Sequence, residues 1–231
     1  MSYTLSSTVL ALIGVGLTFS GIILIFVVPR QLVRGDVAIL MTLSPFRTLS
    51  LILEERNYRG RAIYMPPRSV SELALPRMFI PKDNINSIPN LINRDDNSRI
   101  AHDPEGILLN PVGVDLAKVF ESLLGNRLSD ITLEHSRERL PDILTNKLQL
   151  FSSVAIVING NQINVRMSGQ TSYTICDSVR NLSDVHQIVG CPFCSAIGVI
   201  LSDISGRPCI LENSALEDGI TINNDYKLIN E

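Results

Sequence analysis

The strongest constraint in the sequence is an uncharged apolar run near the N-terminus. Thr8–Val28 spans 21 residues without a single Lys, Arg, Asp or Glu. About 20 apolar residues in a helix cross the ~30 Å hydrocarbon core of a bilayer, and only a helix satisfies its own backbone hydrogen bonds there. A cleaved signal peptide is the main alternative, but the leader lacks a basic residue and no small-residue cleavage site follows. We therefore expect residues 1–30 to form a transmembrane anchor.

The charges that flank this run predict its orientation. Arg30 and Arg34 follow it closely, whereas no basic side chain precedes it. Lys and Arg are enriched on the cytoplasmic side of membrane helices. The expected location is the cell membrane, in a single-pass arrangement with the soluble domain in the cytoplasm.

A second apolar stretch lies within residues 31–58. Val37–Leu53 contains Pro45 and Arg47 near its middle, and a central Arg costs ~2.5–3.5 kcal/mol on insertion scales. We expect a membrane-proximal helix, with Ser44 as an N-cap and Pro45 as the first residue of its second half. A second membrane crossing over residues 37–53 remains an alternative.

The remaining residues, 59–231, read as an α+β soluble domain with antiparallel hairpins behind the one transmembrane helix. The Asn-, Asp- and Ser-rich stretch 82–104 predicts a mobile loop, because these side chains compete for backbone hydrogen bonds. Two β-type runs around Asn159-Gly160 predict a hairpin. Helices and strands alternate irregularly, which favours α+β. Further strands are expected at 61–65, 77–80, 106–109, 208–213 and 219–229, and helices at 114–124, from near Pro141, at 171–180 and at 194–204.

Composition and motifs exclude several function classes. The net charge of −3, the absence of Trp and the lack of a long basic run argue against nucleic-acid binding. No phosphate-binding loop, nucleophile elbow or zincin motif occurs, so we predict no catalytic residue. The expected partners are the lipid bilayer and a protein or small ligand of unknown identity, with the oligomeric state open.

The cysteines are the residues best suited to chemistry, and all lie in the last third of the chain. Cys191 and Cys194 form a C-P-F-C motif. A thiol pair at the start of a helix acquires a lowered pKa and can act in redox chemistry. The same pair could instead bind zinc, with Cys176, Cys209 or His186 completing a tetrahedral set. A third interpretation is that the cysteines are small buried hydrophobes in a reducing cytoplasm.

Several segments resemble a known family. The stretches NYRGRAIYMPP, RMFIPK, GILLNPVG and GCPFCSAIGVILSDISGRPCILE are similar to those of uncharacterised archaeal membrane-anchored proteins. The resemblance extends over roughly Asn57–Glu212 and implies a shared fold and a membrane location, without an activity. Cys191–Gly219, with Gly206 and Glu212, also resembles part of the 4-vinyl-reductase-type small-molecule-binding domain, in which the cysteines lie near a ligand or metal site.

Taken together, these features favour a membrane-tethered, non-catalytic binding or interaction module. A thiol-redox or zinc-binding protein that uses Cys191 and Cys194 is the first alternative. A structural subunit of a membrane complex is the second.

Overall fold

The computed structural model describes residues 8–27, 35–67, 77–85, 100–102, 104–182 and 184–229. These residues divide into two compact units, Met1–Ala38 and Ile39–Glu231. The first unit contains helix α1, and the second contains the α+β domain.

Helix α1 covers Thr8–Val27, as the uncharged run predicts. Its 20 residues correspond to a length of about 30 Å at 1.5 Å per residue. The apolar side chains described along it are exposed, with Leu17 at 70%. α1 therefore presents an apolar surface around its whole circumference.

Among the described residues, the stretch that is long and apolar enough to cross a membrane is Val185–Ser205. The part of α1 with described side chains, Leu10–Ile25, is apolar but shorter. However, 78% of the most apolar 18-residue window in this stretch is buried inside the protein, and the stretch is divided at Gly190 into two helices. It therefore belongs to the core of the domain.

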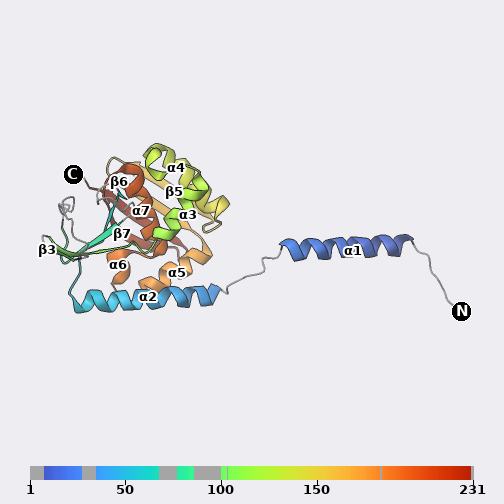
Figure 1. Ribbon diagram of the computed structural model, residues 1–231, viewed down its shortest axis with the longest axis horizontal. Coiled ribbons are helices and arrows are strands. Elements are labelled where there is room, and N and C mark those ends of the chain that lie inside the picture. The colour runs from blue at the N-terminus through green and yellow to red at the C-terminus, as the bar shows by residue number, and fades with distance from the viewer. Residues whose placement is uncertain are drawn as a thin grey trace. The chain divides into compact units, whose positions relative to one another are not determined.

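Helix α2 covers Gly35–Glu55 and runs along one side of the domain (Figure 1). Phe46 and Leu53 on its inner face are buried in the main core. The predicted break at Ser44 is wrong, because the helix continues through Pro45. Proline removes the hydrogen bond to the carbonyl of Met41, and both side chains lie on the exposed face. The position of the missing hydrogen bond is therefore on the exposed side of the helix and not in the core of the domain.

The domain is built on one eight-stranded sheet of the described residues, in the order β3-β4-β2-β1-β7-β8-β6-β5. Every pairing is antiparallel, so the α+β prediction is confirmed. The strands are β1 Ile63–Met65, β2 Arg77–Pro81, β3 Ile100–His102, β4 Glu105–Leu109, β5 Ser153–Asn159, β6 Gln162–Ser168, β7 Cys209–Glu217 and β8 Thr221–Leu228.

The β5–β6 hairpin forms where the sequence predicts it, but its turn is displaced by one residue. Asn159 pairs with Gln162, so the loop is Gly160-Asn161 rather than Asn159-Gly160. Gly160 has a φ of 62°, which glycine adopts without steric cost.

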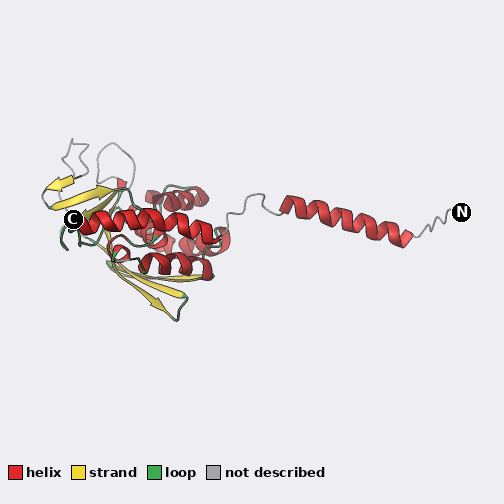
Figure 2. Cartoon of the chain, turned by 90° about the horizontal axis from the view of Figure 1, so that it is seen from below, coloured by secondary structure: helices red, strands yellow, loops and turns green. Residues whose placement is uncertain are grey.

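Helices surround the central helix α7, which packs against β1, β7 and β8 (Figures 1 and 2). α7 begins at Pro192, ends at Ser205 and is capped by Gly206 in the left-handed conformation. The other elements are α3 Val114–Leu124, the 3₁₀ turn η3 Leu128–Asp130, α4 Leu133–Asp142, the π-helical turn η4 Ile143–Lys147, α5 Gln170–Arg180 and α6 Val185–Val189.

Two corrections concern these helices. α4 begins at Leu133, where Thr132 caps it through the N–H of His135, and not near Pro141. Pro141 lies inside α4, and the π-helical turn follows directly, a geometry that changes the backbone hydrogen-bond register. The predicted loop at 82–104 lies mostly outside the described residues, although β3 occupies part of it.

The sheet has an apolar core on each face because strand side chains alternate between faces. Tyr64 in β1 joins the main core under α7, whereas its neighbours Ile63 and Met65 join a smaller core with Phe79 on the opposite face. Gly198 of α7 packs directly on the Tyr64 ring, where a Cβ atom would approach ring carbons to 2.4 Å. This contact fixes α7 close to the centre of the sheet.

Candidate metal centre

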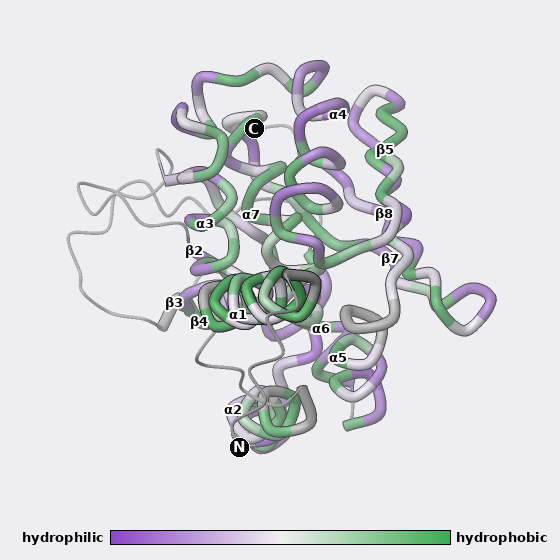
Figure 3. Tube along the Cα trace, turned by 90° about the vertical axis from the view of Figure 1, so that its right-hand side faces the viewer, coloured by the Kyte–Doolittle hydropathy of each residue, from purple (hydrophilic) through white to green (hydrophobic). Residues whose placement is uncertain are grey.

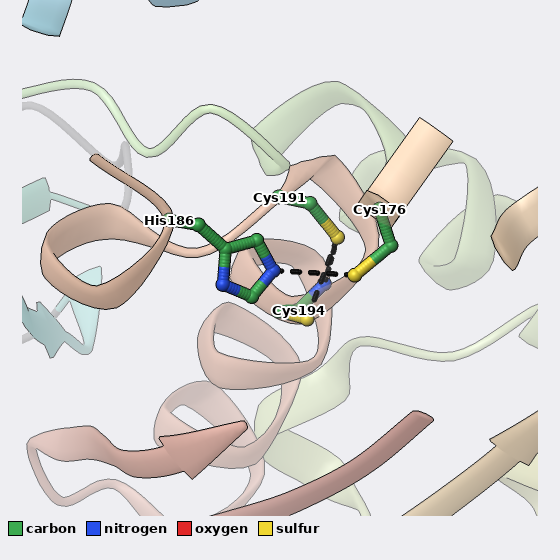
Figure 4. Close-up of side chains that lie close together, drawn as sticks. All are labelled: Cys176, His186, Cys191 and Cys194. Carbon is green, nitrogen blue, oxygen red and sulfur yellow. Dashed lines mark hydrogen bonds between the residues drawn. The ribbon is translucent and has the colours of Figure 1, made fainter. Parts of the chain in front are cut away.

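Three helices bring together four side chains of the kinds that can bind a metal ion (Figure 4). Cys176 comes from α5, His186 from α6, and Cys191 and Cys194 from the start of α7. Their ligand atoms all lie within 4.8 Å of one another. Cys176 Sγ lies 3.2 Å from His186 Nε2, and Cys191 Sγ lies 3.4 Å from Cys194 Sγ. We refer to these four residues as the Cys/His cluster.

The start of α7 determines the positions of two cluster residues. Cys191 is the N-cap and Pro192 occupies the first helical turn, where a missing N–H costs nothing. The backbone N–H of Cys194 points to Cys191 Sγ at 3.5 Å. The capping geometry itself therefore places the two sulfur atoms side by side.

Gly190 connects α6 to α7 and brings His186 next to the cysteines. It has a φ of 70°, and a Cβ at this position would lie 3.0 Å from Cβ of Cys194 and 3.3 Å from the Tyr64 hydroxyl. A side chain would therefore meet both strain and crowding. The tight turn allows α6 to fold back so that His186 faces Cys176.

The cluster is closed to solvent. Its four side chains are at most 2% exposed. Burial raises the pKa of the Cys191 thiol, whereas hydrogen bonds from Cys176 and Cys191 lower the pKa of Cys194. The cluster thus favours negative charge on Cys194, and a bound cation would stabilise such a thiolate.

Buried polar side chains of the sheet support the cluster from outside. The side-chain amide of Asn224 in β8 donates to Cys194 Sγ at 3.4 Å. The hydroxyl of Tyr226 donates to the Cys194 carbonyl at 2.8 Å, and that of Tyr64 to the Val189 carbonyl at 2.8 Å. Burial raises the pKa of both tyrosines, so both remain neutral donors.

Replacing Tyr226 by phenylalanine tests this support. The Tyr226→Phe variant removes a buried hydrogen bond without leaving a large cavity, so we expect a loss of about 1–2 kcal/mol in the free energy of unfolding. Urea unfolding monitored by circular dichroism measures it. The Tyr58→Phe variant is a control. Tyr58 belongs to the core, but it makes none of the hydrogen bonds to the cluster segment described above. Equal losses in both variants would contradict the assigned role of Tyr226.

The structure joins some predicted ligands and separates another. Cys176, Cys191 and Cys194 meet, and His186 completes the group from helix α6, which the sequence did not predict. Cys209 lies in β7 outside the group, fully buried, and burial raises its pKa. The sequence signal for His186 is its position five residues before Cys191, because a short helical turn and Gly190 can fold this interval back.

The surface clefts of the described domain include two that border its helices α6 and α7. The larger, of about 870 Å³, is bordered by α3, η3 and α7 and carries charges of both signs, including Lys118, Glu121 and Asp203. The second, of about 460 Å³, lies between the end of α2 and the outer face of α6, with Arg59 and Arg61 in its lining. α6 therefore contributes His186 to the interior and other side chains to a cleft.

Fold and site together define an α+β domain with a buried cluster of three cysteines and one histidine. The chain belongs to the family described as a domain of unknown function (DUF7982), which matches residues 3–183. No curated protein and no solved structure matches the chain. The family match includes Cys176 and ends before the other three cluster residues.

Proposed function

We propose that this protein is a membrane-tethered binding module whose domain is stabilised by a structural zinc ion held by the Cys/His cluster. The observation that carries the proposal is the mutual proximity of four ligand atoms within 4.8 Å. Three thiolates and one imidazole form a common set for structural zinc.

The spacing of the cluster suits this ion. Zinc bonds of about 2.3 Å to sulfur and about 2.0 Å to nitrogen place tetrahedral ligand atoms roughly 3.5–3.8 Å apart. The Cys176 Sγ–His186 Nε2 and Cys191 Sγ–Cys194 Sγ separations, 3.2 and 3.4 Å, lie just below this range and need only a small side-chain movement. Four protein ligands leave no open coordination position for a substrate. The burial of the cluster also keeps a substrate from reaching it. A structural role is therefore favoured over a catalytic one.

Helix α1 supports the membrane-tethered part of the proposal. It is uncharged, about one bilayer core in length and followed by Arg30 and Arg34. With the domain in the reducing cytoplasm, the cysteines stay reduced and available to a metal. The resemblance of Cys191–Gly219 to the 4-vinyl-reductase-type domain supports a metal or ligand role for the same cysteines.

A thiol-redox site is the second candidate, because Cys191 Sγ lies only 3.4 Å from Cys194 Sγ. Exchange with a partner needs an accessible sulfur. Both residues are 0% exposed. The same burial that favours a structural metal therefore opposes redox exchange.

Metal analysis of the full chain, purified in detergent, tests the zinc proposal. We expect about one zinc per chain, as the four ligands form one tetrahedral site. X-ray absorption should show three sulfur ligands and one nitrogen ligand. Protein that contains no zinc after expression in zinc-supplied cells, with thiols that react readily in the folded state, would overturn the proposal in favour of a dithiol.

A further inference from the structure

Helix α2 has an unusual outer face. Its inner face packs into the core through Phe46 and Leu53. Its outer face should then be polar if water covered it, because surface helices are amphipathic. Instead Leu40, Met41 and Leu51 are 65%, 69% and 60% exposed.

These side chains form one continuous stripe. Exposed residues recur at spacings of three and four, which places them on one side of a helix. Arg47 is the only charged residue between Val37 and Leu53, and the other exposed polar residues there are uncharged. We call the outer stripe the α2 face; its members are Val37, Leu40, Met41, Ser44, Pro45, Thr48, Leu51 and Ile52.

We propose that the α2 face lies in the lipid interface of the same bilayer that holds α1. This inference rests on the membrane anchoring proposed above. It adds a second contact, in which α2 lies along the bilayer surface instead of crossing it. Helices with an apolar face bury that face about 5–10 Å into the boundary between headgroups and acyl chains.

The covalent chain argues for lipid as the occupant. Only residues 28–34 separate α1 from α2. At ~3.6 Å per residue this connection spans at most about 30 Å, so α2 begins close to the bilayer surface if α1 crosses it. Arg30 and Arg34 in the connection, and Arg47 in α2, can interact with anionic headgroups.

Packing also separates this arrangement from a second membrane crossing. Phe46 and Leu53 belong to the same core as α7 and the sheet. A crossing helix would have to leave that core or carry the domain into the bilayer. α2 at the interface keeps its inner contacts and removes its outer stripe from water.

The absence of Trp from the chain permits a direct test. Single tryptophans are introduced into the full chain at Met41→Trp and Leu51→Trp for α2, and Phe19→Trp for α1. Val157→Trp is the matched control, because Val157 is exposed on β5, which lies on the opposite side of the domain from α2 (Figures 1 and 3). Each variant is reconstituted into phosphatidylcholine–phosphatidylglycerol vesicles with and without brominated acyl chains.

We expect bromolipid to quench the α2 tryptophans by roughly half, most strongly with bromine near the headgroup, as an interfacial depth requires. Phe19→Trp should be quenched most strongly by bromine deep in the acyl chain, and Val157→Trp should be unaffected. If Phe19→Trp is quenched while both α2 variants are not, the inference fails and the anchor stands. If none is quenched, the anchoring fails as well.

A second copy of the chain covering the α2 face gives a different result. The α2 tryptophans would then emit at shorter wavelength without bromolipid quenching, and vesicle cross-linking would yield a dimer. That outcome overturns the lipid proposal.

Discussion

Replacing Cys194 by alanine is expected to abolish zinc binding and to lower the free energy of unfolding by at least about 3 kcal/mol, because binding free energy at a structural zinc site is folding free energy. Cys194 lies at the centre of the cluster: it is next to Cys191 Sγ and accepts from Asn224. Zinc content by mass spectrometry and thermal unfolding in detergent measure the two effects.

Cys209→Ala is the matched control for this variant. Cys209 is as fully buried as Cys194 but lies outside the cluster. Its replacement removes one buried sulfur atom, so a loss of about 1–2 kcal/mol and full zinc content are expected. Equal destabilisation in the two variants, with zinc unchanged in both, would show that the cysteines act only as core residues.

Replacing Gly113 by alanine is expected to cost about 3 kcal/mol, at the upper end of the range for overpacking. Gly113 precedes α3, and its N–H donates to the Ser195 hydroxyl of α7 at 3.2 Å. A Cβ here would lie 2.2 Å from the backbone nitrogen of Ala196 and 2.4 Å from the carbonyl oxygen of Pro192. Backbone atoms cannot rotate away as a side chain can, so α3 and the start of α7 must separate.

The same movement would disturb the turn that carries Cys191 and Cys194, so zinc affinity should fall as well. Gly219→Ala provides the comparison: its φ is 70°, but no atom lies near its Cβ position. Backbone strain alone should cost about 1 kcal/mol there. Urea unfolding and competition with a chromogenic chelator measure stability and affinity. If Gly113→Ala is no more destabilising than Gly219→Ala, the close approach of α3 to α7 is wrong.

Local patterns were enough to predict most elements of the domain. Gly125 and Gly206 end α3 and α7 in the left-handed conformation, as helix-stop glycines do. Alternating β-branched residues around Gly160 give the hairpin. These features depend only on residues close together in the sequence, so a single sequence is enough to predict them.

The missed features depend on contacts between distant residues. α6 is only five residues long, too short for a helical repeat to be visible, and its packing on the core defines it. Pro45 and Pro141 were expected near helix starts, yet tertiary packing keeps both inside helices. The strand order likewise could not be predicted from local pattern.

The same limit applies to the cluster. Cys191 and Cys194 were identified as a pair because their spacing is local. Cys176 and Cys209 were equivalent by sequence, and only the fold of α5 and β7 separates them. His186 depends on the reversal at Gly190, which a single sequence does not specify.

The position of β7 and β8 has a consequence for biosynthesis. These last two strands lie between β1 and β6, so the strands made earlier stay in two separate groups until they are added. The sheet can therefore close only after β8 has left the ribosome. Until then each group of strands exposes an unpaired edge, β1 in one group and β6 in the other.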